Sequence, residues 1–169
     1  MPTAYIGLGA NLGAADQTIA RAVEALDRMP DIAVTGCSSL YRSAAMVLSP
    51  TERQPDYINA VARLDTLLTP MPLLRRLQGL ERRFGRLRTG RRWAARQLDL
   101  DLLLYGKQRV SLPRLAVPHP GIAERAFVLL PLAEIAPEGL IVPGYGPLDA
   151  LLERLTDNSN YSACTKICP

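Results

Sequence analysis

The sequence predicts an α+β domain, and three observations lead to this prediction. Strand-like and helix-like hydrophobic patterns follow one another in the order βαββαβ, with further elements behind them. The chain has 169 residues, which is enough for one domain with a substantial core. Its composition, 48% hydrophobic and 21% charged, is typical of a globular protein. We therefore expect a ferredoxin-like core, an antiparallel sheet with helices on both faces in a three-layer α-β-α arrangement.

The first half of the chain predicts three strands and one helix. Apolar residues recur at helical spacing from Ile19 to Met29, and Pro30 ends that pattern. Residues 57–67 alternate instead, which is typical of a strand. The expected order is a strand at 4–9, a turn at 10–13, this helix, a strand at about 32–41, a long loop at 42–56 and the strand at 57–67.

The second half predicts two further strands among helical segments. Thr69 and Pro70 are typical of a helix start, a stripe of leucines follows, and Gly85 is typical of a helix end. Beyond it we expect an arginine-rich loop at 86–95, a strand containing Asp99, a short strand near 109–112, an α region at 118–136 and a helix at 148–155. Residues 1–156 are thus predicted to form one domain, and residues 157–169 a disordered polar tail.

The distribution of charge excludes several classes of protein. The net charge is +4, but residues 75–96 hold nine arginines and one acid, Glu81, so this segment carries +8 and the remainder −4. Basic charge confined in this way differs from the broad basic face of a nucleic-acid-binding protein. No apolar run approaches the ~18 to 20 residues that span a bilayer, and the first residues lack the features of a secretory signal. We expect a cytoplasmic protein without nucleic-acid or membrane partners.

The three cysteines do not indicate a metal site. Cys37, Cys164 and Cys168 have no zinc-ligand spacing, and His119 is the only histidine. Cys37 is expected to be a small buried hydrophobic residue, and the other two are expected to be free thiols in the polar tail.

Two carboxylates, Asp99 and Asp101, are the most informative feature for function. They stand two residues apart in a strand-like stretch, so both project from one face while Leu98, Leu100 and Leu102 project from the other. Proteins usually hold Mg²⁺ with one or two carboxylates and substrate phosphates. The arginines upstream would supply the counter-charge that a polyphosphate requires. An isolated pair is equally consistent with a solvated strand edge, so the pair alone does not decide the function.

Five segments share their order and spacing with one known family. The strongest runs from Arg92 to Asp101 and contains both aspartates; the others are Gln54–Ala60, Val117–Pro120, Glu124–Leu129 and Pro131–Pro137. Together they resemble the 6-hydroxymethyl-7,8-dihydropterin pyrophosphokinases of folate biosynthesis, over roughly residues 4–155. The resemblance implies a monomeric enzyme that transfers the β,γ-diphosphate of ATP to the hydroxymethyl oxygen of 6-hydroxymethyl-7,8-dihydropterin and releases AMP, with two Mg²⁺ ions.

The resemblance also implies roles for individual residues. Asp99 and Asp101 would be the metal ligands, and together with Arg86 and Arg96 the catalytic residues. The implied pterin site comprises Ser43, Ala44, Met46, Tyr57, Asn59, Trp93 and Phe127, with Tyr57 and Phe127 as its aromatic walls. The implied ATP site comprises Leu74, Gln78, Glu81, Arg88, Trp93, Arg96, Leu102, Arg114, His119 and Arg125. Trp93 would lie on a loop that closes over the substrates.

Without the resemblance, simpler interpretations stand beside these roles. Tyr57 and Phe127 would be interpreted as core aromatics, and His119 equally well as a capping residue between two prolines. Gln78 and Glu81, three residues apart, could form a solvated helical face.

Two other functions fit part of this sequence. A metal-dependent nucleotidyltransferase also uses an Asp-x-Asp pair, but commonly with a Gly-Ser turn shortly before it. A ferredoxin-like RNA-binding module would need aromatics within a basic strand.

Several positions depart from the family pattern. Ala10 stands where the family usually has serine, and the loop at 42–47 lacks the usual prolines and glycine. Thr89 replaces an occasional basic residue, and the tail matches no family feature.

Overall fold

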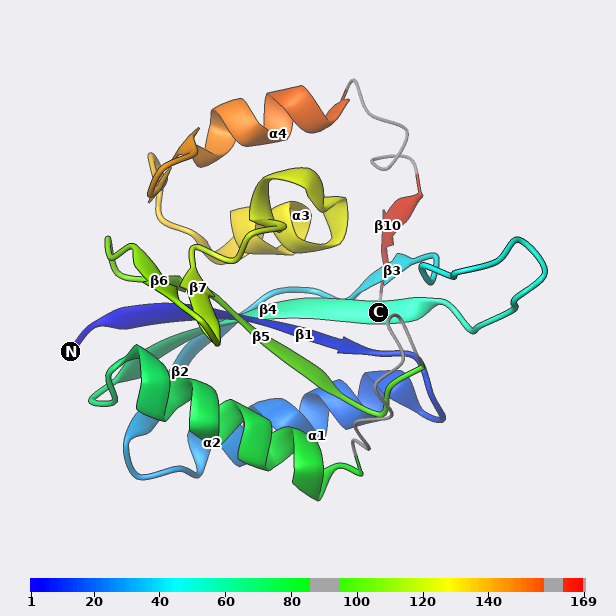
Figure 1. The fold of residues 1–169 in the computed structure, drawn as a ribbon, viewed down its shortest axis with the longest axis horizontal. Helices are drawn as coiled ribbons and strands as arrows, with labels where there is room; N and C mark the ends of the chain where they lie inside the picture. The colour runs from blue at the N-terminus through cyan, green and yellow to red at the C-terminus, as the bar shows by residue number, and fades with distance from the viewer. Residues whose placement is uncertain (86–94, 157–162, 169) are drawn as a thin grey trace.

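The computed structural model describes residues 1–85, 95–156 and 163–168, and its centre is a six-stranded sheet (Figure 1). The strands of this sheet are β1 (Thr3–Ala10), β2 (Ile32–Cys37), β3 (Tyr41–Ser43), β4 (Tyr57–Thr66), β5 (Asp99–Tyr105) and β10 (Cys164–Lys166). Their order is β10-β3-β4-β1-β5, with β2 also paired to β4, and every pairing among the described residues is antiparallel. The predicted antiparallel sheet is therefore confirmed.

Helices cover both faces of the sheet. In Figure 1, α1 (Ala15–Asp27) and α2 (Pro70–Arg83) lie below the sheet, and α3 (Ala126–Ile135) and α4 (Leu148–Thr156) lie above it. Each face has its own apolar core, so the sheet is buried from both sides. The smaller elements are the pair β6 (Val110–Leu112) and β7 (Leu115–Val117), the 3₁₀ turn η1 (Ile122–Glu124), and the pair β8 (Ile141–Val142) and β9 (Gly146–Pro147).

Helix α2 illustrates how the sequence sets these elements. Leu73, Leu77 and Leu80 are fully buried against the sheet, as their spacing predicts. Thr69 precedes the helix in an extended conformation, although its side chain makes no capping hydrogen bond to the described residues. Gly85 follows the helix with φ +84°, a left-handed conformation that glycine adopts without strain.

A register shift in the β1–β5 pair determines which face each residue of β5 supplies. Pairing shifts between Tyr5 and Ile6 of β1, so Leu103 is the extra residue on β5. Before this bulge, Leu100 and Leu102 pack in the core between the sheet and helices α1 and α2. At the bulge, Leu103 and Leu104 both pack in the opposite core, between the sheet and helices α3 and α4.

The prediction of one continuous strand at 32–41 is wrong, because the structure divides this segment into β2 and β3. The hydroxyl of Ser38 accepts a hydrogen bond from the Val61 amide (2.9 Å), and the Ser38 amide donates to the Val61 carbonyl (2.9 Å). A side chain thereby occupies a place in the ladder that a backbone carbonyl would otherwise take. The edge strand consequently restarts at Tyr41.

The disordered tail is also corrected where the structure describes it. Cys164–Lys166 forms β10, which pairs with β3, and the Ile167 amide donates to the Leu40 carbonyl (2.8 Å). Backbone pairing to an open sheet edge, rather than an apolar pattern, orders this segment. Cys164 is buried, whereas Cys37 is exposed instead of buried because it lies at the end of an edge strand. Residues 157–162 and 169 lie outside the described residues.

Candidate active site

Strand β5 presents the two aspartates side by side on the face toward α3. Asp99 and Asp101 alternate with the buried Leu100 and Leu102, as the sequence pattern predicts. The adjacent strand β1 places glycines opposite them: Gly9 faces Asp99, and Gly7 faces Asp101. The two carboxylates therefore lie beside residues of β1 that have no side chain.

These glycines form part of the floor of a cavity. A Cβ atom on Gly9 would lie 3.4 Å from Oδ1 of Asn59 and 3.7 Å from Cδ1 of Tyr57, and one on Gly7 would lie 3.4 Å from Leu103. Neither Gly7 nor Gly9 is among the site residues that the resemblance implies. Their position within a predicted strand was nonetheless a signal, because glycine in a strand interior often marks a close approach of another group.

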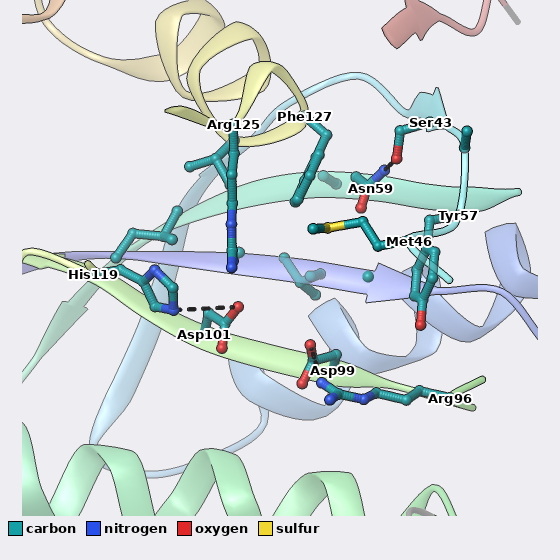
Figure 2. A pocket seen from close by; sticks show the side chains of 17 residues that line it. Ser43, Met46, Tyr57, Asn59, Arg96, Asp99, Asp101, His119, Arg125 and Phe127 are labelled. Atoms are coloured by element: carbon teal, nitrogen blue, oxygen red, sulfur yellow. Dashed lines mark hydrogen bonds and ion pairs between the residues drawn. The ribbon is translucent and has the colours of Figure 1, made fainter. Parts of the chain in front are cut away.

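The cavity above this floor has a volume of about 340 Å³ and brings together eleven of the residues that the resemblance implies (Figure 2). They come from both implied sites and are Ser43, Ala44, Met46, Tyr57, Asn59, Arg96, Asp99, Asp101, His119, Arg125 and Phe127. The other lining residues are Gly7, Leu8, Gly9, Ala60, Leu103 and Val128. Segments that lie far apart in the sequence therefore converge on one cavity, as the motif spacing implies.

One end of the cavity is built from two aromatic rings and a buried amide. Tyr57, at the start of β4, and Phe127, at the start of α3, are both half-buried. Asn59 is 5% exposed, and its Nδ2 atom donates to the hydroxyl of Ser43 (2.8 Å) and to the carbonyl of Tyr41 (3.4 Å). In Figure 2 the amide oxygen of Asn59 points away from Ser43 and into the cavity. It is thus placed to accept a hydrogen bond from a ligand.

The other end of the cavity is ionic. Arg96 donates to Oδ2 of Asp99 (2.6 Å), and the guanidinium of Arg125 lies 5.8 Å from the centre of the Phe127 ring. Burial and the neighbouring charge of Asp99 raise the pKa of Asp101 to about 7, although Arg125 and Arg96 oppose this change. A carboxylate whose charge is this poorly compensated is suited to a cation.

His119 borders the carboxylates with a defined tautomer. Its Nδ1 atom accepts a hydrogen bond from the Gly121 amide (3.0 Å), so the proton of the neutral ring is on Nε2, which lies 3.9 Å from Oδ2 of Asp101. Burial and the charge of Arg125 lower the pKa of His119. The ring is therefore held as a neutral donor that faces the cavity.

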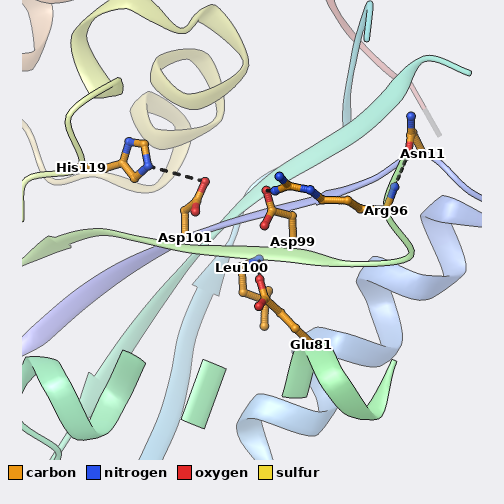
Figure 3. A network of polar contacts seen from close by, with 7 residues as sticks. All are labelled: Asn11, Glu81, Arg96, Asp99, Leu100, Asp101 and His119. Carbon is orange, nitrogen blue, oxygen red and sulfur yellow. Dashed lines mark hydrogen bonds and ion pairs between the residues drawn. The ribbon is translucent and has the colours of Figure 1, made fainter. Parts of the chain in front are cut away.

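A polar network at the start of β5 holds this part of the strand in place (Figure 3). The Arg96 amide donates to Oδ1 of Asn11 (2.9 Å), and the Asn11 amide donates to the Arg96 carbonyl (3.2 Å). The Nδ2 atom of Asn11 donates to the carbonyl of Pro55 (3.1 Å). The buried Asn11 thus connects the arginine end of the site with the segment that leads into Tyr57.

Glu81, which the resemblance assigns to the nucleotide side, is buried between α2 and β5. It is 2% exposed, and its Oε1 atom accepts a hydrogen bond from the Leu100 amide (2.8 Å), between the two aspartates (Figure 3). In the described part of the chain, Glu81 and Gln78 line neither of the two cavities. The apolar stripe of α2 faces the sheet, and Glu81 follows Leu77 by four residues, so helical geometry turns Glu81 inward with it. Its observed contact supports β5 from below.

A second cavity, of about 350 Å³, contains the remaining described residues of the implied ATP site. Leu74 of α2, Leu102 of β5 and Arg114 of the β6–β7 turn line it, and it shares Asp101 and His119 with the first cavity. Its other lining residues are Leu100, Leu112, Pro113, Leu115, Ala116 and Pro120. The two cavities therefore meet at Asp101 and His119.

The remaining implied residues, Arg86, Arg88 and Trp93, lie outside the described residues. Among the residues that are described, no group of three or more His, Cys, Asp or Glu side chains forms a metal site. Two carboxylates nevertheless suit Mg²⁺, which commonly completes its shell with water and substrate phosphates. Of the helices in the described ranges, none has the length and apolar character needed to cross a membrane.

Two carboxylates suited to Mg²⁺, with arginines and a histidine donor around one polar cavity, form the donor set of phosphoryl-transfer enzymes. The fold and the site thus define a small α+β protein of that class. The chain belongs to the 7,8-dihydro-6-hydroxymethylpterin-pyrophosphokinase (HPPK) family, whose pattern matches residues 5–137. The predicted family is therefore confirmed.

Curated relatives agree over most of the chain. A Haemophilus influenzae protein is 40% identical over 158 residues, which cover 94% of this chain and 96% of that protein. A Pseudomonas aeruginosa protein is 46% identical over 134 residues, which cover 79% and 80% respectively. Both relatives are 2-amino-4-hydroxy-6-hydroxymethyldihydropteridine pyrophosphokinases.

Solved structures support the fold. The crystal structure of Plasmodium falciparum HPPK-DHPS with pteroate matches 98% of this chain with a TM-score of 0.74, at 13% sequence identity. The chain covers 46% of that longer protein, so it corresponds to less than half of it. At this level of identity, the similarity concerns the fold.

Proposed function

We propose that this protein transfers the diphosphate group of ATP to 6-hydroxymethyl-7,8-dihydropterin, as an enzyme of folate biosynthesis. The observation that carries the proposal is the junction of the two cavities at Asp101 and His119. A flat acceptor in the first cavity and a nucleoside in the second would bring the polyphosphate to this junction. Family membership and the curated relatives support the same activity.

The aromatic end of the first cavity suits a pterin. A flat heterocycle with polar edges would stack between Tyr57 and Phe127, and the amide oxygen of Asn59 would accept a hydrogen bond from its rim. Stacking on an aromatic side chain contributes ~1 to 3 kcal/mol for nucleic-acid bases, which are chemically similar ligands. The buried Asn59 adds specificity, because a ligand without a matching donor would leave its oxygen unsatisfied.

The ionic end of the first cavity suits the polyphosphate. Asp99 and Asp101 would hold Mg²⁺, which neutralises phosphate charge and lowers the pKa of a coordinated hydroxyl. Arg96 and Arg125 would donate to phosphate oxygens, and His119 would add a neutral N–H donor from Nε2. The second cavity would hold the nucleoside between the apolar Leu74 and Leu102, with Arg114 as its basic lining residue.

In the transfer step, the hydroxymethyl oxygen attacks the β-phosphorus, the bond from that phosphorus to the bridging α-phosphate oxygen breaks, and AMP leaves. Positioning and charge stabilisation account for most of the catalysis in such reactions. Arg96 and Arg125 would stabilise the charge that develops on the phosphate oxygens. The proton of the hydroxymethyl group would pass to Asp99, Asp101 or water.

Four finer features also belong to this proposal. We interpret the β1-α1-β2-β4-α2-β5 portion of the chain as a ferredoxin-like core, within one domain that spans residues 1–156. We further propose that the enzyme acts as a monomer and uses two Mg²⁺ ions. Asp99 lines the first cavity and Asp101 lines both, so the pair offers carboxylate oxygens over a region wide enough for more than one ion.

The decisive experiment identifies the products. Protein, ATP, Mg²⁺ and 6-hydroxymethyl-7,8-dihydropterin are combined, and AMP and the pterin diphosphate are expected to form in equal amounts. Release of pyrophosphate instead would favour a nucleotidyltransferase, and salt-sensitive RNA binding without turnover would favour an RNA-binding module. A 6-methyl pterin serves as a matched control, because it lacks the accepting hydroxyl.

A further inference from the structure

Glu134 of α3 accepts from three donors that belong to two segments of the chain, although in the described part of the chain it lines neither cavity. The Tyr41 hydroxyl donates to its Oε1 atom (2.5 Å), the Ser39 amide to its Oε2 atom (2.7 Å), and the Lys166 ammonium to Oε1 (2.8 Å). Tyr41 lies on β3, and Lys166 lies on β10. One carboxylate therefore joins a helix above the sheet to the sheet edge and to the C-terminal strand.

The carboxylate is held in its charged form. Partial burial alone would raise the pKa of Glu134, but the hydrogen bonds from Lys166, Tyr41 and Ser39 outweigh this effect and lower the pKa to about 2. At neutral pH the three donors thus meet a full negative charge, and hydrogen bonds to charged groups are the stronger kind.

The elements that Glu134 joins carry the walls of the aromatic end of the cavity. Phe127 lies at the opposite end of the same helix, α3. The carbonyl of Tyr41 accepts a hydrogen bond from Nδ2 of Asn59, and Ser43, two residues further along β3, accepts the shorter one. Strand β10 flanks the other side of β3, where Cys164 is opposite Ser43 and Lys166 is opposite Tyr41 (Figure 1).

We propose that Glu134 is a positioning residue for the pterin site, which sets the spacing between Phe127 on α3 and Asn59 on β4 through its bonds to Tyr41 and Lys166. This proposal rests on the proposed function. It predicts selectivity between substrates, because α3 and β3 line the first cavity and not the second, whereas α2 and the β6–β7 pair line the second and not the first; β5 lines both. A residue that supports only overall stability would affect both substrates alike.

The test compares the binding of the two substrates in full-length variants. Glu134→Gln keeps the size of the side chain but removes its charge, Tyr41→Phe removes one hydroxyl, and Lys166→Met removes the ammonium group. Glu24→Gln is the control, because Glu24 of α1 forms an exposed ion pair with Arg28 (3.3 Å), and neither residue lines a cavity. Calorimetry would measure the Kd of 6-hydroxymethyl-7,8-dihydropterin and of a non-hydrolysable ATP analogue with Mg²⁺, and circular dichroism would verify folding.

We expect Glu134→Gln to raise the pterin Kd about fivefold to twentyfold, corresponding to the loss of one or two charged hydrogen bonds. The nucleotide Kd should change by less than about twofold. Tyr41→Phe should have a similar but smaller effect, and it should add little in the Glu134→Gln background because both changes break the same contact. Lys166→Met should act in the same direction.

Two results would overturn the proposal while leaving the function intact. One is a folded Glu134→Gln protein that binds the pterin as well as Glu24→Gln does, and the other is an equal loss of affinity for both substrates. Failure of the wild-type protein to bind the pterin would contradict the proposed function and this proposal together, so the two failures are distinguishable.

Discussion

The Nε2 atom of His119 lies 3.9 Å from Oδ2 of Asp101, at the place where the two cavities meet. The Gly121 amide holds the other ring nitrogen, so this contact brings an N–H donor toward a carboxylate. A ligand that occupied both cavities would contact this pair. In the function proposed above, the substrate phosphates rather than the substrate rings would occupy this place.

The first prediction concerns the two aspartates. Asp99→Asn or Asp101→Asn should abolish turnover and leave the fold intact, because each removes a charged metal ligand without changing the size of the side chain. The protein without ligands should become slightly more stable, since the mutual repulsion of the pair is relieved. Steady-state kinetics at saturating Mg²⁺ and thermal melting would measure both effects. A variant that keeps more than about a tenth of the wild-type kcat, a difference of only ~1.4 kcal/mol, would contradict the metal assignment.

The second prediction concerns Phe127. Phe127→Ala should raise the pterin Kd about tenfold to a hundredfold, because one of the two stacking faces is lost. The Kd of an ATP analogue should change by less than about threefold, since Phe127 does not line the second cavity. Calorimetric titration with each ligand would measure the difference. Equal losses in folded protein would mean that Phe127 supports the architecture rather than the pterin.

The third prediction concerns the nucleotide side. Arg114 lies on the β6–β7 turn and lines only the second cavity. Arg114→Ala should therefore raise KM for ATP several-fold, because the small binding free energy of one exposed charged contact is lost. KM for the pterin should stay unchanged, which is the reverse of the pattern expected for Phe127→Ala. A rise in the pterin KM of similar size would show that the two cavities do not bind the substrates separately.

Much of the fold could be predicted because it depends on local patterns. The stripe of Leu73, Leu77 and Leu80 predicts α2, and the alternation around Asp99 predicts which face of β5 carries the carboxylates. Strand β10 could not be found in this way, since its segment is polar and is ordered by pairing with β3. Short strands at sheet edges depend on contacts with distant segments, which local periodicity does not record.

The candidate site shows the same distinction. Family motifs single out residues such as Asn59 and Phe127, and the structure brings these two together in one cavity. They also assign Glu81 to the nucleotide side, which stays a prediction; the contact that the structure adds is the support of β5 through the Leu100 amide. A motif records that a residue type is required and does not record the direction of its side chain. The bulge at Leu103, which changes the face that β5 presents, is likewise absent from the sequence pattern.

The fourth prediction concerns the glycine floor. Gly9→Val should leave the protein folded, because valine favours strands, but its side chain would occupy the space beside Asn59 and Tyr57. We expect the Kd of the pterin to rise by at least about tenfold. Gly36→Val on β2 is a matched control, since the three atoms nearest to its Cβ would belong to the Arg63 side chain, at 3.8 Å or more, and Gly36 lines neither cavity. Pterin titrations of both variants would show whether the floor accommodates the ligand.

The last prediction concerns the pH dependence of stability that Glu134 produces. Its pKa falls from 4.5 to about 2 on folding, because donors from Lys166, Tyr41 and Ser39 outweigh the effect of burial. A group whose pKa is lowered by folding stabilises the protein above its unfolded pKa, and that stabilisation is lost as the pH falls through the folded pKa.

The full shift in the pKa of Glu134 would contribute about 3 kcal/mol to the free energy of unfolding. Solvent screening of this partly exposed carboxylate reduces the expected contribution to about 1 kcal/mol. At pH 7, Glu134→Gln should therefore unfold at a lower urea concentration than the wild-type protein. The difference should shrink as the pH falls from about 5 toward 2, where the wild-type carboxylate becomes protonated. Urea unfolding of both proteins at several pH values would measure this convergence. A difference that stays constant over this range would mean that the variant loses stability through packing rather than through the charge of Glu134.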